Sequence, residues 1–135
     1  MSAIQQALVY AFRNANLVAN GDFSNGNTSW SVGTGWSTAS GAAVHSGVTN
    51  GNLTQASIFA IGTPYKITFN ATITGTFNLW IAGSELIQSS IPSGYFSKVW
   101  CPRTAGSIFF EAISTAAVTL DNVVVSVATG RGPNL

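Results

Sequence analysis

Acidic side chains, histidine and cysteine are few in this sequence. There are four carboxylates, Asp22, Glu85, Glu111 and Asp121, with one histidine and one cysteine. General acid–base catalysis needs paired carboxylates or a histidine with partners. His45 stands alone among alanine and serine, which predicts a residue on the surface of a sheet. A Gly-x-Ser-x-Gly elbow and a phosphate-binding loop are both missing from the sequence, so the sequence predicts a protein that is not an enzyme.

The single cysteine, Cys101, excludes a disulfide within the chain and a metal site built from several cysteines. It follows Val99 and Trp100 in an apolar run. We therefore expect a buried, inert thiol rather than a nucleophile.

Aromatic and amide side chains are better candidates for binding than for catalysis. A sugar site combines a flat aromatic ring with amide and acid side chains beside it. Trp80 falls on the polar face of an alternating segment, where a large aromatic residue is out of place, whereas Trp30 and Trp36 are predicted to fill the core. The ligand or interface candidates are Trp80, Asn78, Tyr95 and Trp100.

Composition narrows the classes of function. The chain has 135 residues, of which 46% are hydrophobic and only 7% charged, with a net charge of +1. Lysine and arginine are scattered, so no phosphate-binding stripe forms and nucleic-acid binding is disfavoured. The sequence has no run of roughly 18 apolar residues, the length that predicts a membrane-spanning helix. A surface with so few charges does little to oppose association, which predicts permanent contacts in an assembly.

Period-two alternation is the clearest structural signal, and it runs from Tyr65 to Ile73. Thr74 and Gly75 predict a turn, and alternation resumes over residues 76–81, so the pattern predicts a β-hairpin. Further strands are predicted over residues 17–19, 30–37, 42–46, 53–61, 85–91, 95–101, 107–114 and 118–128, with residues 115–117 as a connection. Many short strands separated by turn signals, without a helix, predict an all-β antiparallel sandwich of two sheets and about eight strands.

Three parts are predicted along the chain: an N-terminal arm (1–15), a β-sandwich (16–128) and a flexible C-terminal tail (129–135). The apolar positions of the arm are Ile4, Leu8, Tyr10 and Phe12. Two interpretations stay open for this segment. It is either a first strand or helix of its own domain, or an arm that packs on a neighbouring subunit.

The ends of the sandwich carry a resemblance. Leu17 to Gly26, followed by Trp30 and Trp36, resembles the opening of galactose-binding-like jelly rolls, and residues 118–125 resemble their closing strand. Carbohydrate-binding modules and many small virion proteins of tailed bacteriophages share this pattern. The resemblance implies a jelly roll in which the first and last strands are neighbours, and it implies a structural calcium near Asp22 and Asp121. Ser24 stands where the sugar-binding relatives commonly carry an acidic residue, so we expect these aspartates to bind loop amides and no cofactor to be needed.

The resulting prediction is a non-enzymatic structural protein of a bacteriophage virion, assembled in the host cytoplasm. Its main form is a capsid decoration or cement protein, whose partners are the major capsid protein or another virion protein and further copies of itself, as in a trimer. The alternatives are a carbohydrate-binding module for a host glycan and an accessory protein of the tail or fibre.

Overall fold

The computed structural model describes residues 15–47 and 49–128, and these contain eight β-strands and no α-helix. The strands are β1 (Ser31–Val32), β2 (Trp36–Ala39), β3 (Ala42–His45), β4 (Gly51–Phe59), β5 (Tyr65–Ile81), β6 (Glu85–Gln88), β7 (Gly94–Trp100) and β8 (Gly106–Val127). The predicted all-β fold is confirmed. The arm positions Ile4, Leu8, Tyr10 and Phe12 and the tail (129–135) lie outside the described residues.

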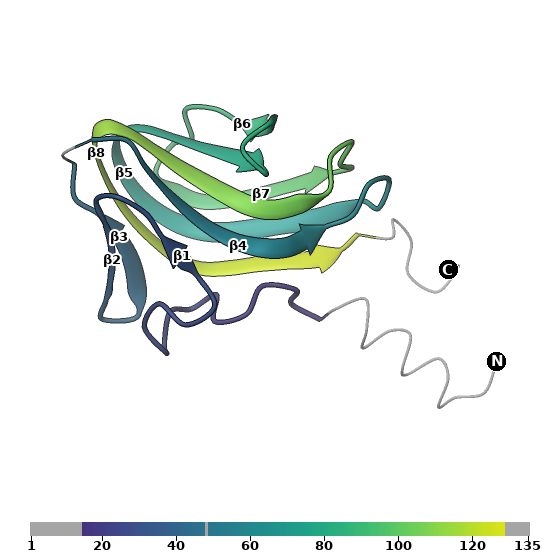
Figure 1. Cartoon of the computed structure of the whole chain (residues 1–135), viewed down its shortest axis with the longest axis horizontal. Coiled ribbons are helices and arrows are strands. Elements are labelled where there is room, and N and C mark those ends of the chain that lie inside the picture. The colour runs from purple at the N-terminus through teal and green to yellow at the C-terminus, as the bar shows by residue number, and fades with distance from the viewer. Residues whose placement is uncertain (1–14, 48, 129–135) are drawn as a thin grey trace.

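Two long strands, β5 and β8, form the frame of the molecule (Figure 1). They pair antiparallel from Tyr65 opposite Val127 to Ile81 opposite Ile108. The predicted hairpin at Gly75 is therefore wrong, because both halves of β5 pair with β8 and not with each other. The predicted connection at residues 115–117 is likewise part of β8. Thr74-Gly75 and residues 115–117 therefore lie on opposite strands of one bend in the ladder between β5 and β8.

The bend divides the strands into two antiparallel sheets. On one side of it lies the order β1-β4-β8-β5-β6, built on residues 106–113 of β8 and 76–81 of β5; we call this the β6 sheet. On the other side lies the order β2-β3-β8-β5-β7, built on residues 117–127 and 65–74, which we call the β7 sheet. At the bend Thr74 pairs with Ala117 and Thr76 with Ile113. β8 thus has three residues where β5 has only Gly75, and such a bulge bends a ladder.

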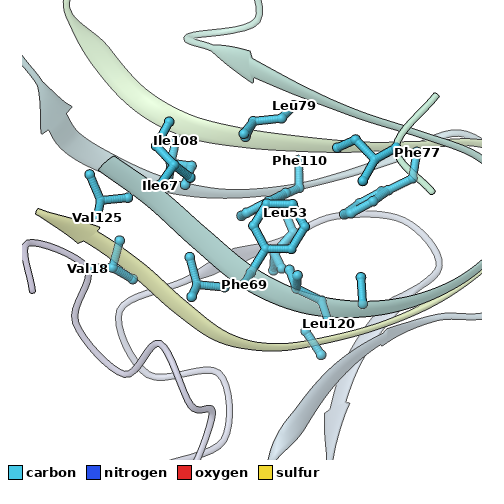
Figure 2. Close-up of a cluster of buried hydrophobic side chains, with 14 of the residues drawn as sticks. Val18, Leu53, Ile67, Phe69, Phe77, Leu79, Ile108, Phe110, Leu120 and Val125 are labelled. Atoms are coloured by element: carbon cyan, nitrogen blue, oxygen red, sulfur yellow. The ribbon is translucent and has the colours of Figure 1, made fainter. Parts of the chain in front are cut away.

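The core lies between the two sheets and is rich in phenylalanine (Figure 2). Phe69 comes from the β7 sheet, and its ring meets Phe110 of the β6 sheet edge-on, with the ring centroids 5.3 Å apart. Phe77 stacks on Phe110 at 5.6 Å. All three side chains are fully buried, so the aromatic contacts hold one sheet against the other.

The opening segment is not the predicted strand. Leu17 donates its backbone N–H to the carbonyl of Val125 (2.8 Å), and Val123 donates to the carbonyl of Gly21 (2.9 Å). The Gln55 side chain accepts from the N–H of Ala19 (2.8 Å) and donates to its carbonyl (2.9 Å). A side-chain amide thus takes the place of a strand ladder, while the segment still lies beside the last strand, as the resemblance implied.

Both tryptophans predicted to fill the core are buried. Trp30 packs against Phe110, and its indole N–H donates to the carbonyl of Asn20 (3.0 Å). Trp36 donates in the same way to the carbonyl of Gly51 (3.0 Å).

Two of the expectations for single residues are wrong. His45 is 1% exposed and not on the sheet surface, because it shares the inward face of β3 with Ala43 and its ring contacts the carbonyls of Ala116 and Thr49. Cys101 is exposed and not buried. It follows the end of β7, whose outward residue Val99 is itself 60% exposed, so the apolar run does not mark a core strand.

Within the two described ranges, no helix has the length and apolar character needed to cross a membrane.

Replacing Gly75 should destabilise the fold at the bend. Gly75 has a φ of +97°, and a Cβ placed there would lie 2.9 Å from the Cα of Ala116. We expect Gly75→Ala to lower the free energy of unfolding by about 2–3 kcal/mol, measured by urea denaturation. The control is Gly62→Ala, where φ is +82° but a Cβ meets nothing within 4 Å, so only about 1 kcal/mol of backbone strain is added. Equal losses in the two variants would show that the bend tolerates the extra atom.

Candidate functional site

The outer face of the β6 sheet gathers two aromatic residues, an amide and a carboxylate. Asn78 and Trp80 project from β5, and Glu111 and Phe109 project from the neighbouring β8. They face outward because the alternate residues of both strands, such as Leu79 and Phe110, are fully buried. Asn78 lies opposite Glu111, and Trp80 lies opposite Phe109. We call these four residues the Trp80 platform.

Hydrogen bonds fix the Trp80 platform. Oε1 of Glu111 accepts from the indole Nε1 of Trp80 (2.8 Å) and from Nδ2 of Asn78 (3.1 Å). Oδ1 of Asn78 accepts from the backbone N–H of Ser90 (2.9 Å). Trp80 lies opposite Phe109, but its indole bonds to Glu111, the next outward residue along β8. The indole therefore extends along the strand, over the surface of the sheet. The ring is half-buried and held in one orientation.

The groups of the Trp80 platform are of the kinds that binding surfaces use. It offers an aromatic ring, an amide whose hydrogen bonds orient it, and the second oxygen of Glu111 as an acceptor. Glycoside hydrolysis normally uses two carboxyl groups about 5–9.5 Å apart, and Glu111 is the one carboxylate of this platform.

Sequence reasoning named Trp80 and Asn78 as candidates but did not name Glu111, which bonds to both. The expected hairpin paired the two halves of β5, so it left Glu111 with no reason to lie beside Trp80. The signal that was available is weak: Glu111 alternates with Phe110 and Ala112, which places it on an outward face.

Trp100 lies apart from the platform, at an edge where the two sheets meet. It pairs with Tyr65 on the inward side of β7 and packs against the core. Its indole N–H donates to Oε2 of Glu85 on β6 (2.8 Å). Lys98 of β7 donates to the carbonyl of Ile87 (3.0 Å) and to Oε1 of Gln88 (2.9 Å), both of β6. These bonds tie β6 to β7, and a ligand role for Trp100 stays a prediction.

Tyr95 lies on the outer face of the β7 sheet, 68% exposed. It pairs with Asn70 of β5, which in turn pairs with Asp121 of β8. The structure therefore places the four ligand or interface candidates in three regions and brings only Asn78 and Trp80 together.

The two residues proposed for calcium, Asp22 and Asp121, each accept a hydrogen bond from the backbone. Asp22 accepts from the backbone N–H of Ser24 (3.0 Å), which lowers the pKa of its carboxyl, and Asp121 accepts from that of Asn122 (2.7 Å). Calcium takes about six to eight oxygen ligands. In the described part of the chain, no three acidic, histidine or cysteine side chains come together as a metal site would require.

Comparison with known proteins identifies the fold. No family model and no curated protein sequence matches the chain. Among solved structures it is similar to a carbohydrate-binding module solved with β-1,4-galactotriose, TmCBM61 (TM-score 0.56, 11% identity, 84% of this chain and 99% of that one). It is also similar to the CBM22-1 xylan-binding domain of Paenibacillus barcinonensis Xyn10C (TM-score 0.56, 10% identity, 87% and 97%).

A third similar structure is the enzymatically active domain of tailspike protein 4 from bacteriophage CBA120 (TM-score 0.55, 21% identity). The match covers 83% of this chain but spans only 21% of the tailspike chain. The three likenesses confirm the predicted class: the chain folds as a jelly-roll sandwich of the carbohydrate-binding-module type, a fold also present within a phage protein.

Removing the charge of Glu85 should weaken the edge between the sheets. Burial by itself raises the pKa of Glu85, but hydrogen bonds from Trp100, the Arg103 backbone and Thr104, with the Arg103 charge, outweigh it and lower the pKa. The stabilisation is therefore present above the ordinary carboxyl pKa of about 4.3 and is lost as the pH falls through the lowered folded-state value. Glu85→Gln should lower the free energy of unfolding by about 1–3 kcal/mol at pH 7. This difference from the wild type should shrink as the pH falls below the ordinary carboxyl pKa, and urea unfolding across pH measures it.

The matched variant is Trp100→Phe, which keeps an aromatic ring but removes one donor to Glu85. Trp100→Phe should reproduce part of the loss in unfolding free energy that Glu85→Gln shows at pH 7. A difference between Glu85→Gln and the wild type that stays constant down to pH 2 would contradict the assignment.

Proposed function

We propose that this protein is a non-catalytic carbohydrate-binding module that holds a glycan on the Trp80 platform. The observation that carries the proposal is the shared acceptor: one oxygen of Glu111 fixes both the Trp80 indole and the Asn78 amide. The jelly-roll fold supports it, since the similar modules include one bound to a galactose oligosaccharide and one named for xylan binding.

The physical basis is preorganisation. Sugars present apolar C–H faces that stack on an aromatic ring, and hydroxyl groups that pair with carboxylates and amides. A ring already held in one orientation loses little side-chain entropy when the ligand binds, and side-chain ordering is one of the main costs of association. The second oxygen of Glu111 accepts a hydrogen bond from a sugar hydroxyl group beside the ring.

The setting of the module is a separate part of the proposal. The similarity to part of a phage tailspike favours a virion, and there the domain acts as a tail or fibre accessory that holds a host glycan. This likeness gives no support to capsid decoration, to a capsid-protein partner or to a trimer. The comparisons thus favour the carbohydrate-binding alternative over the cement-protein prediction.

Trp80→Ala should remove most of the affinity for the glycan. A glycan array identifies the ligand, and titration calorimetry then measures its dissociation constant. We expect a loss of at least about tenfold, as for a buried aromatic anchor, and a smaller loss for Trp80→Phe, which keeps a ring but not the bond to Glu111. The control is Val99→Ala, which removes an exposed apolar side chain from the β7 sheet. Unchanged affinity of Trp80→Ala would remove the platform from the site.

Deleting residues 1–13 distinguishes capsid decoration from glycan binding. If the protein decorates a capsid through an N-terminal arm, the deletion abolishes particle association. If it is a glycan-binding module, the truncated chain keeps the dissociation constant of the full chain in the same calorimetric titration.

A further inference from the structure

A hollow of about 490 Å³ lies on the outer face of the β7 sheet, away from the Trp80 platform. Its walls come from β5, β7 and β8 and from the segment before β7. It is lined by Asn70, Ala71, Thr72, Ser93, Gly94, Tyr95, Thr119 and Asp121. We call it the Tyr95 hollow.

A row of three side chains crosses the Tyr95 hollow. Tyr95 of β7 pairs with Asn70 of β5, and Asn70 pairs with Asp121 of β8. A ring, an amide and a carboxylate are therefore adjacent on three neighbouring strands. Directly opposite side chains on one sheet face lie about 4.5–5.5 Å apart at their Cβ atoms, which is the scale of one sugar ring.

A bulge in β8 lies directly after the carboxylate of Asp121. Thr68 pairs with Val124 and Asn70 with Asp121, so Asn122 and Val123 together face one residue of β5. Asn122 takes a φ of +54°, a conformation that asparagine tolerates better than most residues. Two successive residues, Asp121 and Asn122, thus point away from the core. Bulges often serve to re-aim a side chain.

The polar groups of the Tyr95 hollow are available to a ligand. Within the described residues the amide of Asn70 makes no side-chain hydrogen bond, and Asp121 uses Oδ1 for the N–H of Asn122. Thr72 and Thr119 are exposed. Ser93, by contrast, is occupied, since its hydroxyl group accepts from the N–H of Ile73 (2.7 Å) and donates to its carbonyl (3.0 Å), which fixes the wall of the hollow.

The lining selects a class of ligand. It combines an aromatic ring 68% exposed with hydroxyl, amide and carboxylate groups and contains no basic side chain. Sugar hydroxyls match these donors and acceptors, whereas a uronic or sialic acid would bring its own negative charge toward Asp121.

From these observations we infer that the Tyr95 hollow is a second saccharide site, which takes a neutral sugar unit. The two sites face away from each other on sheets that pack about 10 Å apart, so one short oligosaccharide does not reach both. If the proposed function of the Trp80 platform holds, the domain binds two glycan segments and cross-links glycan chains.

The test titrates ¹⁵N-labelled full-length protein with β-1,4-galactotriose, mannohexaose and xylohexaose, using hexagalacturonic acid as the charged control. In Trp80→Ala we expect saturable shifts of the amides at residues 70–72, 93–95 and 119–121 with the neutral sugars and none with the uronate. Tyr95→Ala should lose these shifts and keep those around the Trp80 platform. Asp121→Asn, which keeps the shape of the hollow, should weaken its binding at least fivefold.

The outcomes separate the two proposals. Shifts at the platform alone overturn the second site and leave the proposed function standing, whereas shifts at the hollow alone support the second site and overturn the platform. The absence of saturable shifts at both faces overturns both. If Tyr95→Ala instead changes the sedimentation coefficient and no sugar shifts the hollow, this face is a contact between protein copies and the inference is wrong.

Discussion

The antiparallel ladder between β5 and β8 is the constraint on which the rest of the structure depends. Each strand runs through both sheets, so every other strand is placed by pairing with one of these two or with a neighbour of theirs. Because the ladder bends at Gly75, outward side chains from the same strand end on opposite faces of the sandwich. β5 thus supplies Asn70 to one outer face and Asn78 with Trp80 to the other. The bend makes a domain with two separate polar faces.

The sandwich is closed at its margins by directed hydrogen bonds from polar side chains. Gln55 clamps the opening segment through both groups of the Ala19 peptide backbone. Lys98 and Glu85 join β6 to β7 with hydrogen bonds to backbone and indole groups. In the described residues no buried side-chain nitrogen or oxygen lacks a partner. A chain that is only 7% charged therefore satisfies its buried polar atoms mainly with amides and carbonyls, which avoids the desolvation cost of buried ion pairs.

Fold similarity and site chemistry carry different parts of the functional argument. The two similar carbohydrate-binding modules share this fold at only 10–11% identity, so the likeness shows the fold and not the outer faces. In the proposed function, ligand choice depends on which side chains the ladder presents outward. Here these are a tryptophan fixed by Glu111 on one sheet and a tyrosine beside Asn70 and Asp121 on the other.

Period-two alternation in the sequence determined the two halves of β5 and the faces of their side chains. Alternation predicted that Trp80 faces outward and that Phe69 and Phe77 face inward, because side-chain direction follows from period two alone. The tertiary structure decided which strands pair. Thr74-Gly75 carries the same local signal in a tight turn as in a bent strand, and only the distant register with β8 distinguishes the two. That register brings Glu111 to Trp80, buries His45 against the carbonyl of Ala116, and leaves Cys101 exposed after an edge strand. Contacts between residues far apart in the chain depend on the packing of both sheets, which no short window of sequence contains.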